Sequence, residues 1–151
     1  MPTLHMVIRD AVAAQLEAAP VLADGGVRVG RKRPMPQAVA RQLFVDLDDS
    51  PATPTAMGQF VEWQTRVRVE CLARDAAGQS ADDMADQLLA DVYGRVMDDP
   101  RLAGRALDTN PAGMAWRTED DAELGIAACT VLFTVRHLSL IHISEPTRLR
   151  R

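Results

Sequence analysis

Three histidines and two cysteines are the side chains of this 151-residue chain best suited to acid–base, nucleophilic or metal chemistry. His5, His137 and His142 lie near the two ends of the sequence, with no cysteine or carboxylate at metal-ligand spacing. Cys71 and Cys129 fall in predicted strands on the apolar side, where a free cysteine behaves as a small hydrophobic residue. The sequence therefore predicts surface or edge histidines, buried reduced thiols, and neither a metal nor a cofactor.

Sequence motifs that build common active sites are missing from the chain. None of the patterns GxGxxG, GxxxxGK[ST], HExxH and GxSxG occurs. Because catalysis needs several groups that converge on one place, we expect no catalytic residues and a protein that is not an enzyme.

Length and composition indicate one folded domain. Hydrophobic residues make up 47% of the chain and charged residues 25%, as in ordinary globular proteins. The net charge of −4 disfavours binding to a phosphate backbone. No apolar run is long enough to span a membrane, and Arg9 and Asp10 interrupt the apolar pattern of the first residues. We therefore expect no signal peptide and a reducing cytoplasmic environment.

The segment VRVGRKRP is the most basic part of the chain. It places four cations within six residues, namely Arg28, Arg31, Lys32 and Arg33. One interpretation is that these side chains contact phosphate, and another is that they are solvated charges that protect an edge strand from unwanted pairing. A third interpretation is that they meet the acidic turn of another copy, since a head-to-tail ring needs two complementary patches per subunit. That turn contains Glu119, Asp120 and Asp121.

Two segments are long for hairpin connections and are predicted to be exposed loops. They are Asp48–Met57, rich in turn-forming residues, and Asn110–Glu119. Exposed tryptophan and methionine side chains favour protein interfaces; the alternative interpretation is that Trp116 packs over a sheet edge. The residues proposed to contact a partner are Asp48, Asp49, Met57, Met114 and Trp116.

Helical periodicity appears twice. Apolar residues at three- and four-residue spacing from Leu4 to Leu16 predict a first helix, with Thr3 as its cap and Pro20 as its stop. A second helix is predicted to begin after Ser80, where Ser80 and Asp83 form a capping-box pattern, and to end before Pro100.

Strand patterns occupy the rest of the chain. Strands are predicted at 27–31, 42–47 and 61–71, and two long strands are expected around the acidic turn 119–123. The order helix, three strands, helix, two strands predicts an α+β domain with a mostly antiparallel sheet and both helices on one face. The other face, which carries Arg66, Arg68 and Glu70, should stay open to water or to a partner.

The last residues, LSLIHISEPTRLRR, differ in composition from the text before them. This string resembles a translated sequencing-adapter read-through, so we expect residues 138–151 to be a non-native or disordered tail and residues 1–137 to be the domain. A basic tail that binds an acidic partner is the alternative interpretation.

Four segments in this order resemble the tail terminator proteins of bacteriophages and prophages, which are similar to minor tail protein U of phage lambda. The segments are VRVGRKRPMP, LFVDLDD, FVEWQTRVRVECLARDAAGQSADDMADQLLADVYGRVM and CTVLFTVRH. The resemblance covers nearly all of residues 1–137 and consists of a pattern of elements with loose motifs.

The resemblance implies a structural virion protein without catalytic residues or cofactors. Such a subunit forms a ring, typically a hexamer, in the host cytoplasm and becomes part of the virion tail. The ring caps the tail tube, stops its polymerisation and offers a surface to head-completion proteins, while DNA only passes through the lumen. A head-closure or neck protein of the phage connector, or a small nucleic-acid or regulatory binding protein, remains an alternative.

Overall fold

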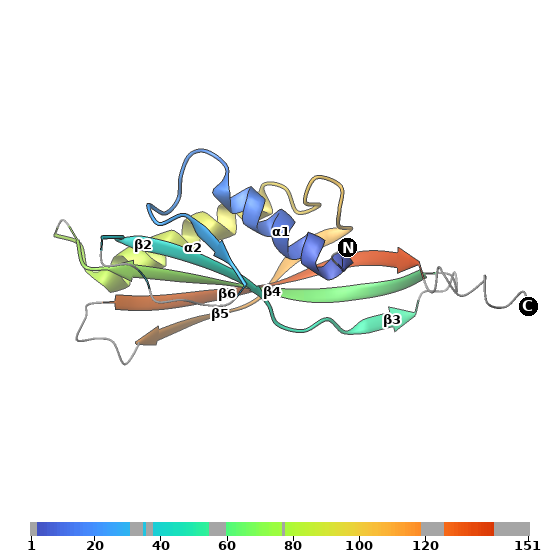
Figure 1. The fold of residues 1–151 in the computed structure, drawn as a ribbon. Helices are drawn as coiled ribbons and strands as arrows, with labels where there is room; N and C mark the ends of the chain where they lie inside the picture. Colours follow the sequence, from blue (N-terminus) through green and yellow to red (C-terminus); the bar gives the residue numbers. More distant parts are fainter. Residues whose placement is uncertain are drawn as a thin grey trace, which may run out of the picture.

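The computed structural model describes most of the chain, in the ranges 3–30, 35, 38–54, 60–76, 78–118 and 126–140. These residues form two helices and a six-stranded sheet, and both helices lie on the same side of the sheet (Figure 1). The predicted α+β class, the single domain and the mostly antiparallel sheet are confirmed.

Both helices begin at the predicted caps. Helix α1 spans Leu4–Glu17, and the Thr3 hydroxyl accepts a hydrogen bond from the Met6 amide at 3.2 Å. Helix α2 spans Ala81–Met97, and the Ser80 hydroxyl accepts from the Asp83 amide at 3.2 Å. In each case the side chain satisfies an amide that has no partner within the helix.

The order of the strands across the sheet differs from their order along the chain. Its strands are β1 (Val27–Val29), β2 (Arg41–Leu47), β3 (Ala52–Pro54), β4 (Phe60–Arg74), β5 (Asp108–Thr118) and β6 (Ile126–Leu140). The path across the sheet is β1-β2-β4-β6-β5, and β3 pairs with β4 beside this path. Only the β1–β2 pair is parallel. The two ends of the path, β1 and β5, therefore lie at opposite edges of the sheet, and β3 forms a further short edge on the β2 side of β4.

Strands β4 and β6 form the long centre of the sheet. They pair in register over 15 residues, from Phe60 opposite Leu140 to Arg74 opposite Ile126. Strand β6 thus continues past His137, the predicted end of the domain. The non-native origin of the tail stays a prediction, and residues 141–151 lie outside the described ranges.

Two segments that were predicted to be loops contain strand. Strand β3 lies within Asp48–Met57, because β2 is shorter than β4 and leaves part of the β4 edge to be paired. Residues 110–118 lie in β5, where the register shifts between Pro111 and Gly113. Proline lacks an amide donor but is tolerated on an edge strand or at a bulge, so its presence did not exclude a strand.

The main core lies between the helices and the sheet. Alternate residues of the central strands point towards the helices, as in Val67, Val69 and Cys71 of β4 and Val131 and Phe133 of β6, all of them buried. The buried residues of α2 face them, and Met84 is partly buried; the buried set is Ala81, Ala85, Leu88, Leu89, Val92 and Val96. The apolar residues that alternate along the strands therefore pack against the apolar residues that recur every 3.6 positions along the helix.

The opposite face is less open than predicted. Glu70 is buried there, and a second small apolar cluster covers one end of this face. The cluster contains Met35, Phe44, Leu72 and Ala128. Arg66 and Arg68 lie on the same face and remain partly or fully exposed, as expected.

Candidate functional site

The edge strand β5 carries two of the predicted partner-contact residues. Met114 and Trp116 are 41% and 59% exposed, although they lie in a strand and not in a loop. The Trp116 indole donates a hydrogen bond of 2.9 Å to Asp86 of α2, so the ring lies near this helix while most of its surface stays in solvent. Exposed aromatic surface of this kind is typical of an interface.

Further exposed apolar side chains lie near the same edge and at the opposite one. Leu107 precedes β5, and Tyr93 of α2 stacks on the buried Phe133 with a centroid distance of 6.5 Å. At the other edge of the sheet, Val29 of β1 is exposed, as is Val21 in the segment that leads to it. Apolar surface is thus available at both edges.

The basic segment begins on β1. Arg28 is exposed in this strand, at the opposite edge of the sheet from β5. Among the described residues, no ion pair involves Arg28. Six of the seven proposed seam residues, Arg31, Lys32, Arg33, Glu119, Asp120 and Asp121, lie outside the described ranges together with Met57. The pairing between these charges therefore stays a prediction.

Asp48 and Asp49 bind arginines of their own chain. The Asp49 carboxylate accepts from Arg66 Nε at 2.6 Å and from a terminal nitrogen at 3.1 Å. Asp48 pairs with Arg68. The two pairs and the backbone bond from the Arg66 amide to the Asp49 carbonyl, 2.7 Å, hold the segment leading to β3 against β4. A contact between these acids and a partner stays a prediction.

A third arginine on the same face is also neutralised. Arg136 Nε donates to both carboxylate oxygens of Asp108 at 3.0 and 3.1 Å, and Glu62 lies 3.5 Å from a terminal nitrogen. The hydrogen bond to Asp108 and the charges of both acids raise the pKa of Arg136. Arg66, Arg68 and Arg136 thus already have carboxylate partners, which reduces the cationic surface available to phosphate on this face.

His5 and His137 come together, which the sequence analysis missed. His137 is 1% exposed, its Nε2 lies 2.6 Å from the Thr65 hydroxyl, and its ring centroid lies 5.3 Å from that of His5. Burial, with a smaller effect from His5, lowers the pKa of His137 to about 4. The surface assignment of His137 was wrong. His137 lies two residues after Val135 in β6 and so continues the alternating series of buried residues. That alternation was the signal that could have predicted its burial.

The two cysteines are buried, as predicted, and are register partners on β4 and β6. Burial raises the pKa of the Cys129 thiol to about 11 and that of Cys71 well above its usual range. Both side chains are therefore protonated thiols in the core and poor nucleophiles at neutral pH.

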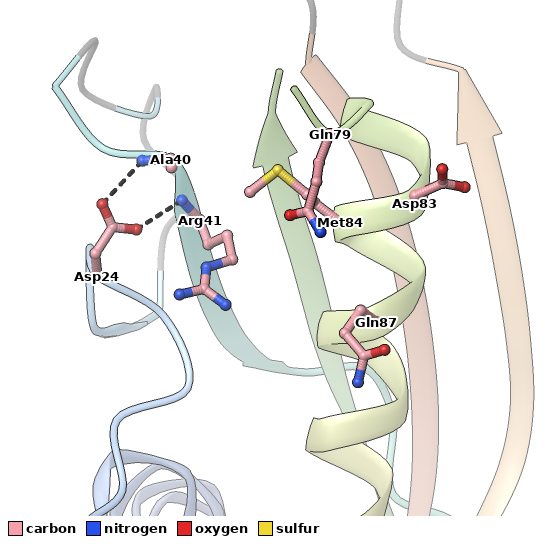
Figure 2. Close-up of a pocket in the computed structure, with 7 residues that line it drawn as sticks. All are labelled: Asp24, Ala40, Arg41, Gln79, Asp83, Met84 and Gln87. Atoms are coloured by element: carbon pink, nitrogen blue, oxygen red, sulfur yellow. Dashed lines mark hydrogen bonds between the residues drawn. The ribbon is translucent and has the colours of Figure 1, made fainter. Parts of the chain in front are cut away.

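A cleft of about 480 Å³ lies between the start of β2 and the first turns of α2, and Figure 2 shows its lining. Asp24 accepts hydrogen bonds from the amides of Ala40 and Arg41 at 3.0 and 2.8 Å, which fixes the entry into β2. Gln87 and Asp83 of α2 are among the residues that line the cleft. The lining mixes one cation, two acids and two amides, a combination typical of a polar surface groove.

No metal-binding group appears in the described part of the chain: no three His, Cys, Asp or Glu side chains lie together in a way that could hold an ion. Of the two helices in these ranges, neither is long and apolar enough to cross a membrane.

Comparison with known proteins identifies a similar fold but no matching protein family. No protein-family model and no curated protein matches the chain. A chain from the virion of a native gene transfer agent particle is 19% identical, with a TM-score of 0.58, over 87% of this chain and 95% of that one. A second similar chain comes from an extracellular contractile injection system, in a structure of the sheath/tube terminator in its extended state. It is 12% identical, over 91% of this chain and 58% of that one. Its TM-score of 0.35 is too low to support an argument. The chain therefore shares its fold with a subunit of a gene transfer agent virion.

Proposed function

We propose that this chain is a structural subunit of a phage-type tail, and that it acts as the tail terminator. The observation that carries the proposal is the fold shared with a gene transfer agent virion chain over nearly the full length of both. The sequence resemblance to tail terminators gives the more specific role.

The proposed action is to cap the tail tube. A ring of subunits, typically six, binds the last ring of tube protein and presents a different upper surface to solvent. The next tube ring then finds no template, so polymerisation stops. Such capping requires only that the chain bind the tube end while its own upper surface does not bind tube protein. The same upper surface is proposed to receive the head-completion proteins.

The chain's surfaces support an assembly role. Exposed apolar side chains lie at both edges of the sheet, including Trp116 and Val29. The segment that contains Asp48 and Asp49, with Met57 beside it in sequence, is proposed to meet the tube or the connector, together with Met114 and Trp116. The cations Arg28, Arg31, Lys32 and Arg33 are proposed to pair with Glu119, Asp120 and Asp121 of the neighbouring subunit.

The nucleic-acid alternative has less support. Arg66, Arg68 and Arg136 on the open face all pair with carboxylates, and the net charge is −4. A protein that binds DNA through phosphate contacts needs free cations.

A tube-growth assay tests the proposal. Tail-tube protein is polymerised with and without the full chain at a substoichiometric amount, and tube lengths are measured by negative-stain electron microscopy. We expect shorter tubes that carry density at one end only. Bovine albumin at equal mass serves as the control for non-specific effects. Unchanged tube lengths and bare tube ends would refute the terminator role, and a chain that binds only connector protein would identify a head-closure protein.

Light scattering coupled to size-exclusion chromatography tests the ring. We expect a species near six times the monomer mass of 16.5 kDa, either alone or after tube protein is added. A monomer or dimer that does not respond to tube protein would contradict ring formation.

A further inference from the structure

The two edges of the sheet are complementary in three respects, and these bear on how two subunits could join. Strand β5 pairs with β6 on one side only, and β1 pairs with β2 on one side only, so in the described ranges each has one backbone edge without a strand partner. Unpaired edges are templates for strand addition by another chain. Most proteins shorten or block such edges. Strand β5 is 11 residues long, whereas β1 has three residues and its Val27 amide donates to Glu17 Oε2 at 3.2 Å.

Strand directions at the two edges are compatible. Strand β1 is parallel to β2, β2 is antiparallel to β4, β4 to β6, and β6 to β5. Strands β1 and β5 of one subunit therefore run in opposite directions. A second copy placed beside the first in the same orientation would bring its β1 against β5 as an antiparallel pair, with the helices of both copies on the same side. Antiparallel pairing is the slightly more stable arrangement.

Apolar surface is concentrated at these edges. Among the large hydrophobic side chains that are exposed in the described ranges, Val29 lies on β1 and Met114 and Trp116 lie on β5, while Leu107 directly precedes β5. Side chains of this type remain in solvent in the single subunit and would become buried if the edges met.

We propose that β5 of one copy pairs with β1 of a second copy, so that the sheet continues from subunit to subunit around the ring. The proposal rests on the proposed ring but is more specific. It moves Met114 and Trp116 from the tube contact to the seam between subunits, because both lie on the edge strand.

Cysteine cross-linking of the full chain tests the seam. Arg28→Cys or Val29→Cys is combined with Met114→Cys or Ala115→Cys in one chain, and the chain is oxidised with copper phenanthroline. Within one subunit β1 and β5 are four strand spacings apart, roughly 19 Å, far beyond the ~7 Å between Cα atoms that a disulfide allows. Both native cysteines are buried, so they do not compete.

We expect covalent multimers larger than dimers from at least one double variant and none from the single variants. The matched control combines Ala115→Cys with Thr53→Cys, an exposed residue on β3, and should give no ladder. Circular dichroism of each reduced variant confirms that it is folded, and only folded variants are scored.

Two results would overturn the seam. Dimers from Ala115→Cys alone, without a ladder in the double variants, would show symmetric β5–β5 pairing. The absence of cross-links in chains that still assemble by light scattering would refute edge pairing while leaving the proposed ring intact. A wild-type chain that never assembles, even with tube protein, would instead refute the ring itself.

Discussion

The imidazole of His137 is enclosed between the sheet and α1, against Thr65 and the ring of His5. Protonation would place a charge in this enclosed site, next to a second imidazole. Its neutral form is therefore favoured in the folded protein, and the unfolded chain takes up a proton at higher pH than the folded one.

The first prediction concerns stability against pH. The pKa of His137 is about 4 in the folded protein and 6.5 as a reference for the unfolded chain. Between these values the unfolded state binds more protons, so the free energy of unfolding falls as the pH falls. From pH 7 to pH 5 the loss from this residue should be up to about 2 kcal/mol.

Urea denaturation of wild type and His137→Gln at pH 7, 6 and 5 measures this loss. Carboxylates titrate in both proteins, so the difference between the two slopes isolates the histidine. Equal slopes would contradict the buried position of His137.

A second residue-scale prediction compares two aromatic side chains. Phe133 is fully buried, so Phe133→Ala should lower the free energy of unfolding by about 3–5 kcal/mol. Trp116→Ala removes a mostly exposed ring and should cost less than about 1 kcal/mol in the single subunit. Thermal and urea unfolding at low protein concentration provide the comparison. Similar losses from both substitutions would show that Trp116 belongs to the core.

At the scale of elements, the start of α2 is fixed by two side chains from outside the helix. Ser80 accepts from the Asp83 amide, and Asp75 accepts from the Ala81 amide at 2.6 Å. Together they satisfy two of the amides that a helix leaves unpaired at its first turn. Helix α2 covers the central strands, so the stability of its first turn affects the packing of the main core.

The third prediction tests this cap. Ser80→Ala should lower the free energy of unfolding by about 1 kcal/mol, because the Asp83 amide loses its partner. Gln79→Ala, a substitution at the neighbouring exposed residue, is the matched control and should be nearly neutral. Urea unfolding followed by circular dichroism measures both. An unchanged midpoint for Ser80→Ala would mean that the cap does not contribute.

Elements with strong local signals were predictable from the sequence, and those defined by pairing were not. Both helices begin at the predicted residues because caps and apolar periodicity are local properties. Strand β3 could not be found in its Pro/Thr segment, because it exists only where β4 extends beyond β2. The loop assigned to 110–119 ignored that Pro111 is acceptable on an edge, and whether a strand is an edge depends on the tertiary fold.

The candidate site residues also divide into those that a local pattern predicts and those that depend on tertiary contacts. The burial of Cys71 and Cys129 followed from strand alternation alone. The contact between His5 and His137 joins the two ends of the described chain, and only the tertiary fold brings them together. The internal ion pairs of Asp48 and Asp49 likewise depend on how the segment after β2 returns along β4.

At the scale of the whole molecule, the proposed ring depends on surfaces of opposite charge. The fourth prediction is that Arg31→Glu with Arg33→Glu weakens assembly by roughly tenfold or more, because like charges then face each other across the seam. Adding Asp120→Lys and Asp121→Lys should restore it. Sedimentation velocity over a concentration series at low salt measures the assembly constant. A failure of the second pair to rescue assembly would contradict this charge pairing.

The central position of β6 has a consequence for the order of events during synthesis. Strand β6 is made after every other described strand, yet it lies between β4 and β5 and provides the only sheet pairing that β5 has. Until β6 leaves the ribosome, β5 has no strand to join and the core lacks one wall. The pairing of β6 with β4 joins segments separated by α2 and β5, and contacts so distant in sequence form slowly. A nascent subunit therefore cannot present a finished β5 edge, and the proposed edge-to-edge assembly must wait until the ribosome has released β6.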